Sequence, residues 1–184
     1  MNRRSSKFLV LAGFAAAALC APLGVVRAQT APAVHLIPQS LQNEHAEDLE
    51  KLDMIAKRPG KVGEIAGKAI ALFKRHESTE KEYIMPALTL LPLLADGNVT
   101  PDMAWAVAMS DRVGANRELI FQQHTAMTDI LAQLVEAADA AHDEDAKEFA
   151  EAAAGDALND VEILEPMVLV VGDYLKMKLA ALPK

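Results

Sequence analysis

Six residues with metal-binding side chains recur at helical spacing in this chain: His45, His76, Glu80, His124, Asp156 and Asp160. Each falls within an apolar series of three- and four-residue steps, which is typical of a helix face turned towards a core. The i, i+4 spacing of His76/Glu80 and of Asp156/Asp160 puts both members of each pair on one helix face. The pattern therefore predicts polar groups buried where several helices pack together.

Carboxylates in such a place need compensation. A buried carboxylate is strongly destabilising unless it is paired or coordinated. No Lys or Arg of these apolar series lies at the same height along the helices as the carboxylates. A bound cation is therefore the simplest counter-charge. A single His in such a series is more often a hydrogen-bonded core residue, and only the set of six favours a metal site.

The six residues can lie in one layer. Turns are expected near Pro59-Gly60 and near His142-Asp143-Glu144. With about 1.5 Å of rise per residue, all six lie roughly 20–28 Å along the helices from these turns.

The composition favours the helices that this layer requires. Aromatic residues make up only 4% of the chain, whereas strands prefer aromatic and β-branched residues. We expect helices over about 38–57, 61–94 with a kink near Pro86, 100–141 and 145–179. Short connections between long helices imply antiparallel neighbours. The predicted fold class is therefore all-α, an antiparallel up-down-up-down four-helix bundle over 38–181.

The chain also repeats itself. Similar residues recur at offsets of 79 or 80 positions: His45 and His124, His76 and Asp156, Glu80 and Asp160, Pro86 and Pro166. We expect two similar helical hairpins related by a pseudo-two-fold axis, with a pair of metal ions across it.

The first 28 residues have the order of a secretory signal. Arg3, Arg4 and Lys7 precede an apolar run over 8–20, and Val26-Arg27-Ala28 ends with a small residue. We expect cleavage after residue 28, a tether over 29–37, and a periplasmic or secreted protein. An uncleaved membrane anchor is the alternative, because residues 8–26 nearly span a bilayer. The paired arginines leave both Sec and twin-arginine export open.

Charge and cysteine content narrow the partners. Cys20, the only cysteine, lies in the predicted signal, so the mature chain has no thiolate ligand. Loss of the signal removes four basic residues and no acidic ones, which changes the net charge from −8 to −12 (−8 − 4). Nucleic acid and anionic membranes are therefore not expected partners, whereas cations are. The oligomeric state is not predicted.

Four segments carry a resemblance to a known family: Ile37-Pro38-Gln39-Ser40-Leu41 with Glu44-His45, His76 through Glu80 to Pro86, Gln123-His124, and Val171-Gly172-Asp173-Tyr174-Leu175. They resemble the hemerythrin-like, or HHE cation-binding, domain family over residues 37–178. The resemblance implies a four-helix bundle with a non-haem di-iron site bridged by two carboxylates. It also implies binding of, or reaction with, dioxygen, peroxide or nitric oxide.

The resemblance assigns His45, His76, Glu80 and His124 to ligand positions, with Glu80 as one bridge. Asp160 stands at the other bridging position, where the family usually has Glu, and Asp156 stands where the family has His. Three histidines and three carboxylates form a more anionic set than that of an oxygen carrier. Two iron ions are the expected cofactor, and manganese becomes an alternative.

Three functions stay open. The first is a redox-active di-metal protein that acts on dioxygen, peroxide or nitric oxide. The second is a non-enzymatic module that binds or senses metal, and the third is a structural bundle with a degenerate site. We expect a metal- and small-ligand-binding protein more than a classical enzyme. Motifs for c-type haem (C-x-x-C-H) and for ferritin-like sites (E-x-x-H) are absent from the sequence.

Overall fold

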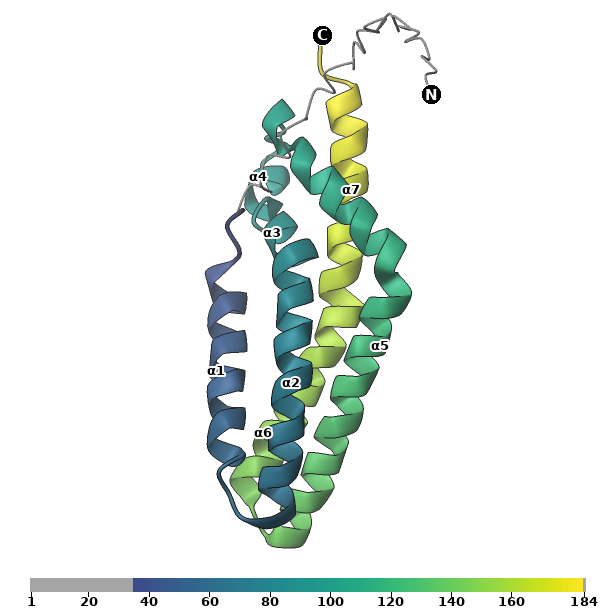
Figure 1. The fold of residues 1–184 in the computed structure, drawn as a ribbon. Helices are drawn as coiled ribbons and strands as arrows, with labels where there is room; N and C mark the ends of the chain where they lie inside the picture. Colours follow the sequence, from purple (N-terminus) through teal and green to yellow (C-terminus); the bar gives the residue numbers. More distant parts are fainter. Residues whose placement is uncertain (1–34, 184) are drawn as a thin grey trace, which may run out of the picture. The chain divides into compact units, whose positions relative to one another are not determined.

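The computed structural model describes residues 35–183. The predicted export signal over 1–28, and residues 29–34 of the predicted tether, lie outside the described residues. Within 35–183 every regular element is a helix (Figure 1), which confirms the all-α prediction. None of the described helices has both the length and the apolar character needed to cross a membrane.

Two long helices open the described chain. α1 (Gln39–Ile55) follows Pro38, whose ring fixes φ near the helical value and whose missing N–H would have had no helical partner. α2 (Gly60–Tyr83) begins after a short loop. Gly60 has a φ of 77°, a left-handed conformation that glycine adopts without a Cβ clash. The predicted boundary at Pro59-Gly60 is therefore observed.

The prediction of one kinked helix over 61–94 is wrong. After α2 the chain forms two short helices, α3 (Met85–Leu88) and α4 (Leu91–Ala95). Pro86 and Pro92 lie in the first turns of α3 and α4, where each lacks the backbone N–H that would bond to the preceding turn. Two prolines so close together break the helix instead of bending it.

The third long helix is continuous. α5 (Ala104–Ala141) follows a 3-10 turn at Pro101–Met103. It ends at His142, which has a φ of 55°. Asp143 then caps α6 (Glu144–Asn159) by accepting a hydrogen bond from the backbone N–H of Ala146 at 3.2 Å. The turn predicted at 142–144 is thus present.

A π-helical turn interrupts the last helix, which the sequence predicted as regular over 145–179. The π turn (Asp160–Leu164) lies between α6 and α7 (Glu165–Ala180). A π turn adds one residue to the helical repeat, so all later side chains rotate. Ile163 and Val170, which continue the three- and four-residue steps of Asp156 and Asp160, are 50% and 66% exposed. Val168, Val171 and Leu175 are buried in their place, so this part of the predicted core face is wrong.

The long helices pack side by side (Figure 1). α2 contacts α5, and α5 contacts α6 and α7. α1 packs mainly on α2 and touches α6 more lightly. At one end, Arg58 forms ion pairs with Asp143 and Asp145, which tie the α1–α2 loop to the α5–α6 turn.

The core consists of two apolar clusters. One includes Leu52 of α1, Phe73 of α2 and Met127 of α5. The other includes Ile84, just after α2, and Ile120 of α5. Buried polar residues interrupt α1, α2, α5 and the last helix between members of the two clusters: His45, His76, Glu80, His124 and Asp160.

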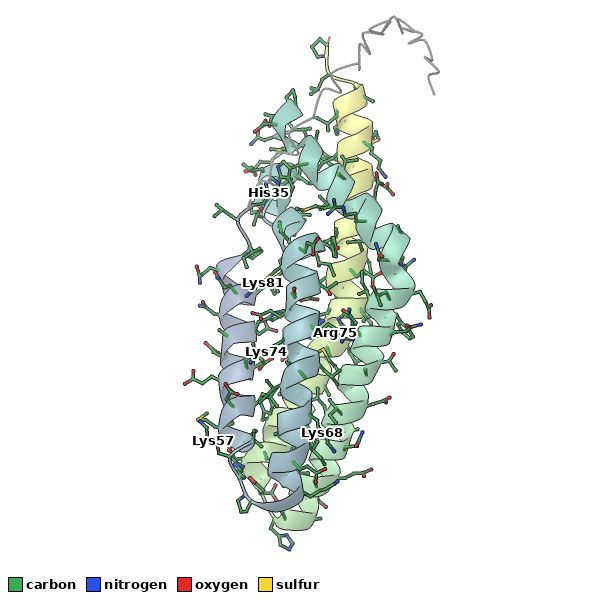
Figure 2. The ribbon with its side chains drawn as sticks, in the orientation of Figure 1. His35, Lys57, Lys68, Lys74, Arg75 and Lys81 are labelled. Carbon is green, nitrogen blue, oxygen red and sulfur yellow. The ribbon has the colours of Figure 1, made fainter. Side chains whose placement is uncertain are left out.

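Basic side chains occupy the outer surface of α2. Lys68, Lys74 and Arg75 are exposed (Figure 2). They belong to the same helix as His76 and Glu80 but make no ion pair with the buried carboxylates among the described residues. The helix thus separates a basic outer face from a buried polar face.

Close packing of α5 on α7 gives a first testable prediction. A Cβ placed on Gly172 would lie 2.0 Å from Ser110 Oγ, so Gly172→Ala should lower the free energy of unfolding. We expect a loss of about 1–3 kcal/mol in urea denaturation, because overpacking displaces the helices. Adding Ser110→Gly should restore most of the stability. A Gly172→Ala variant as stable as the wild type would contradict this helix contact.

Candidate metal centre

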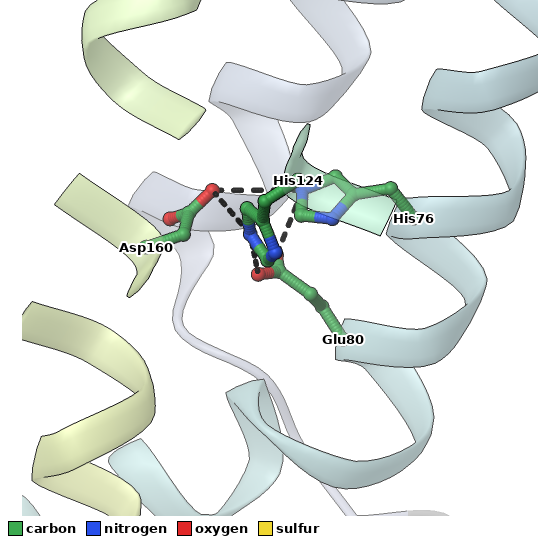
Figure 3. A group of neighbouring side chains, drawn as sticks. All are labelled: His76, Glu80, His124 and Asp160. Carbon is green, nitrogen blue, oxygen red and sulfur yellow. Dashed lines mark ion pairs between the residues drawn. The ribbon is translucent and has the colours of Figure 1, made fainter. Parts of the chain in front are cut away.

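Four buried side chains converge between the two apolar clusters. His76 and Glu80 come from α2, His124 from α5 and Asp160 from the π turn (Figure 3). One nitrogen or carboxylate oxygen from each lies within 4.8 Å of the others. The i, i+4 spacing explains why His76 and Glu80 point the same way from one helix. Residues distant in the sequence thus form one polar group.

The distances suit a shared cation better than direct hydrogen bonds. His76 Nε2 lies 3.6 Å from Glu80 Oε2 and 3.5 Å from Asp160 Oδ2. His124 Nε2 lies 3.9 Å from Glu80 Oε1 and 3.8 Å from Asp160 Oδ2. Hydrogen bonds are shorter, about 2.7–3.2 Å. Ligand atoms about 2.1 Å from one tetrahedral ion are separated by about 3.4 Å, close to these distances.

The backbone orients one of the imidazoles. His124 Nδ1 lies 2.9 Å from the carbonyl oxygen of Ile120. Because a carbonyl only accepts, Nδ1 carries the proton and Nε2 holds the free lone pair. That lone pair faces Glu80 and Asp160. Metal-binding histidines commonly have this arrangement, in which the second nitrogen donates to a fixed acceptor.

Several buried polar atoms in this layer have no hydrogen-bond partner among residues 35–183: Nδ1 of His45, Nδ1 of His76, both carboxylate oxygens of Glu80 and Nε2 of His124. Glu80 is only 1% exposed. Buried polar groups in proteins are nearly always satisfied, and each exception calls for an explanation. A cation coordinated by Glu80 and His124 would satisfy both oxygens of Glu80 and Nε2 of His124, so the donor set fits a metal ion.

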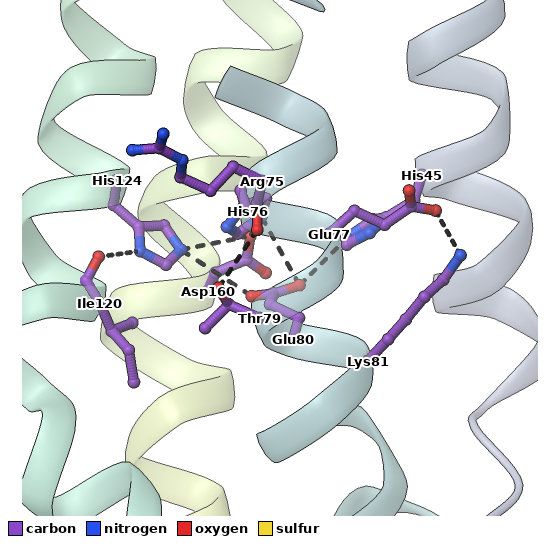
Figure 4. Close-up of polar contacts among 10 residues, drawn as sticks. All are labelled: His45, Arg75, His76, Glu77, Thr79, Glu80, Lys81, Ile120, His124 and Asp160. Atoms are coloured by element: carbon purple, nitrogen blue, oxygen red, sulfur yellow. Dashed lines mark hydrogen bonds and ion pairs between the residues drawn. The ribbon is translucent and has the colours of Figure 1, made fainter. Parts of the chain in front are cut away.

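His45 joins the group from α1. Its Nε2 lies 3.3 Å from Glu80 Oε2, and its ring centre lies 5.6 Å from that of His76 (Figure 4). The two oxygens of Glu80 therefore face different partners: Oε2 faces His45 and His76, and Oε1 faces His124. A carboxylate in this orientation is suited to bridge two ions.

Asp156 lies outside the group of four. It is half-buried on α6, one turn before Asp160. With Glu44, Asp48 and His45 it lines a cavity of about 20 Å³. A cavity of about 10–15 Å³ can hold one water molecule, so this space suits a water or another very small ligand. His76 and Asp156 are equivalent in the sequence repeat, but only His76 belongs to the group of four.

Burial shapes the charges of the layer. Burial, followed by the nearby charges of Asp160 and Glu44, raises the pKa of Glu80 well above its ordinary value of 4.5. Burial also acts to raise the pKa of Asp160, but contacts with His124 and His76 outweigh it and lower this pKa to about 2. Burial and His76 lower the pKa of His45 to about 4. His45 is therefore neutral at pH 7, the form that binds metals.

The sequence patterns missed one buried carboxylate. Glu165 is 3% exposed, and its Oε1 accepts a hydrogen bond from Arg117 Nε at 2.9 Å. Glu165 follows Asp160 by five residues, a spacing that matches a π turn but not the regular face used in the prediction. His35 is half-buried and stacks on Trp105 with ring centres 3.7 Å apart.

Comparison of the chain with models of protein families, with curated proteins and with solved structures finds no match.

The charge state of Glu80 gives a second prediction. Because the folded-state pKa of Glu80 is raised, its ionisation should destabilise the metal-free protein increasingly as the pH rises above about 4.5. Gln has nearly the same size and does not ionise. Glu80→Gln should therefore be more stable than wild type at pH 8 in EDTA, by about 1–4 kcal/mol. The gain should shrink towards zero near pH 4 in urea denaturation.

Glu136→Gln, on the exposed face of α5, is the control and should show little pH-dependent difference. A Glu80→Gln variant less stable than wild type at pH 8 without metal would contradict the inferred cost of the buried carboxylate.

Proposed function

We propose that this chain is a hemerythrin-like metal protein whose buried centre holds two iron ions and interacts with a small oxygen- or nitrogen-containing ligand. One observation carries the proposal. Three helical segments bring His76, Glu80, His124 and Asp160 together in a buried layer, and both oxygens of Glu80 have no hydrogen-bond partner among residues 35–183. A cation between them would remove the cost of this arrangement.

The donor set supports iron or manganese. Imidazole nitrogens suit iron and other transition metals, and carboxylates also suit manganese. Glu80 and Asp160, each facing more than one histidine, are the candidates for the two bridges. His45 and Asp156 extend the donors towards a second position. When bound, such a pair of ions would supply redox chemistry or small-ligand binding.

The residues themselves have separable tasks. Glu80 and Asp160 would hold the positive charge, and His76, His124 and His45 would complete the coordination. Ile120 holds the His124 ring through its carbonyl. The cavity of about 20 Å³ beside His45 admits a ligand the size of water, dioxygen, peroxide or nitric oxide, but no larger substrate.

The finer fold assignment is part of the same proposal. We propose that α1, α2, α5 and the pair α6–α7 form an antiparallel up-down-up-down bundle. The observed neighbours support it: α1 with α2, α2 with α5, and α5 with α6 and α7. Export to the periplasm or the exterior, proposed from the basic and apolar order of residues 1–28, belongs to the part of the chain that the structure does not describe.

A third prediction tests the centre by metal analysis. Purified protein loaded with ferrous iron and then desalted should retain about two ions per chain. His124→Ala should lose most of this iron, because it removes one of the four converging donors. Asp156→Asn should lose at most one ion, because Asp156 is not among those four.

His142→Ala is the matched control, since His142 is exposed at the α5–α6 turn. Wild-type protein that retains no iron or manganese would contradict the proposed function. Equal metal content in His124→Ala and wild type would contradict the assigned centre.

A fourth prediction separates a reactive protein from a binding module, the second candidate. Iron-loaded protein mixed with hydrogen peroxide or nitric oxide should show a change in visible absorption, because the cavity at His45 admits ligands of this size. Sustained consumption of peroxide would favour a reactive centre. A spectral change that reverses when the ligand is removed, without consumption, would favour binding or sensing.

A further inference from the structure

The cavity beside the buried centre leads to a half-buried acidic group. Glu44 and Asp48 of α1 and Asp156 of α6 line it and are half-buried; we call these three residues the acidic mouth. Glu44, Asp156 and Asp160 also line a second, more open space of about 250 Å³ next to Ile163 and Leu164. Asp160 thus borders both the buried cavity and a space that opens outwards.

The acidic mouth is not balanced by basic residues. Among residues 35–183, no Lys or Arg makes an ion pair with Glu44, Asp48 or Asp156. Glu77 also lines the cavity, but Lys81 neutralises it at 2.5 Å. The negative charges of the three carboxylates therefore add to one another and make the electrostatic potential at the acidic mouth more negative.

The buried end of this cavity points to a cation as its occupant. His45 and His76 line the cavity, and their Nδ1 atoms are buried without a hydrogen-bond partner. Both rings also face Glu80 through Nε2. The cavity thus has two buried, unpartnered imidazoles at its inner end and carboxylates without an ion pair at its outer end.

We propose that the acidic mouth is the route by which divalent cations reach the buried centre, and that Glu44 and Asp48 accelerate loading without being permanent ligands. The ligand atoms of Glu44 and Asp48 do not converge with the four central donors, so their contribution is to the rate of capture. A negatively lined opening with low-dielectric walls concentrates cations and raises their association rate. This inference rests on the proposed function.

The helix arrangement supports this location. α1 packs mainly on α2 and contacts α6 only lightly, so the boundary between α1 and α6 is loosely packed. On the other side, α5, which carries His124, contacts α2, α6 and α7. A hydrated cation would therefore meet less resistance between α1 and α6.

The test measures the rate of Co²⁺ binding to metal-free protein by anaerobic stopped-flow absorption. The double variant Glu44→Gln/Asp48→Asn should bind Co²⁺ roughly tenfold more slowly than wild type at low salt. The number of ions bound at equilibrium should stay the same. Raising the salt concentration should slow wild type towards the variant, because salt screens exposed charges.

The matched control is Asp129→Asn/Glu136→Gln, which changes the net charge equally at exposed positions of α5. It should retain the wild-type rate. The single variants Glu44→Gln and Asp48→Asn, checked for folding by circular dichroism, should each show part of the effect.

The outcomes separate the two proposals. If wild type binds Co²⁺ but the Glu44/Asp48 double variant is as fast as the α5 control, the acidic mouth is not the route and the metal centre stands. If the variant binds fewer ions at equilibrium, Glu44 or Asp48 is a ligand and the inferred role is overturned. If wild type binds no Co²⁺, iron or manganese, the proposed function fails, and the inference fails with it.

Discussion

The buried carboxylate of Glu80 is the constraint on which the rest of this structure depends. It is almost fully enclosed, its oxygens have no hydrogen-bond partner in the part of the chain that the structure describes, and its neighbours are imidazoles and a second carboxylate. A helical protein does not keep such a group in its core for stability, because an apolar residue of similar size would be as good or better. The polar layer divides the apolar core into two clusters. Each cluster therefore packs its own part of the helices.

The π turn shows how the last helix meets this constraint. After Asp160 the sequence contains two apolar series that differ by one residue. A regular helix would continue the first series, Ile163, Met167 and Val170. The π turn instead buries the second, which includes Val168 and Val171. The turn thereby joins Asp160 in the polar layer to a well-packed α7. π turns are rare and often occur at functional sites.

Local signals account for what could be predicted from the sequence. The spacing of His76 and Glu80 placed them on one face, and the order of apolar and polar residues identified His124 and Asp160 as buried. The prolines marked a disturbance after α2, but whether a proline bends or breaks a helix depends on packing and on a second proline nearby. The π turn could not be predicted, because both apolar series fit a helix and tertiary packing selects between them. For the same reason the sequence did not distinguish Asp156 at the mouth from Asp160 in the layer, nor identify Glu165.

Anomalous diffraction from crystals of the iron-loaded protein, measured on both sides of the iron absorption edge, tests the proposed centre most directly. We expect one anomalous peak among His76, Glu80, His124 and Asp160, with a second peak on the side of His45. Iron found only at the protein surface, with Glu80 hydrogen-bonded to ordered water in the core, would contradict the proposed metal centre.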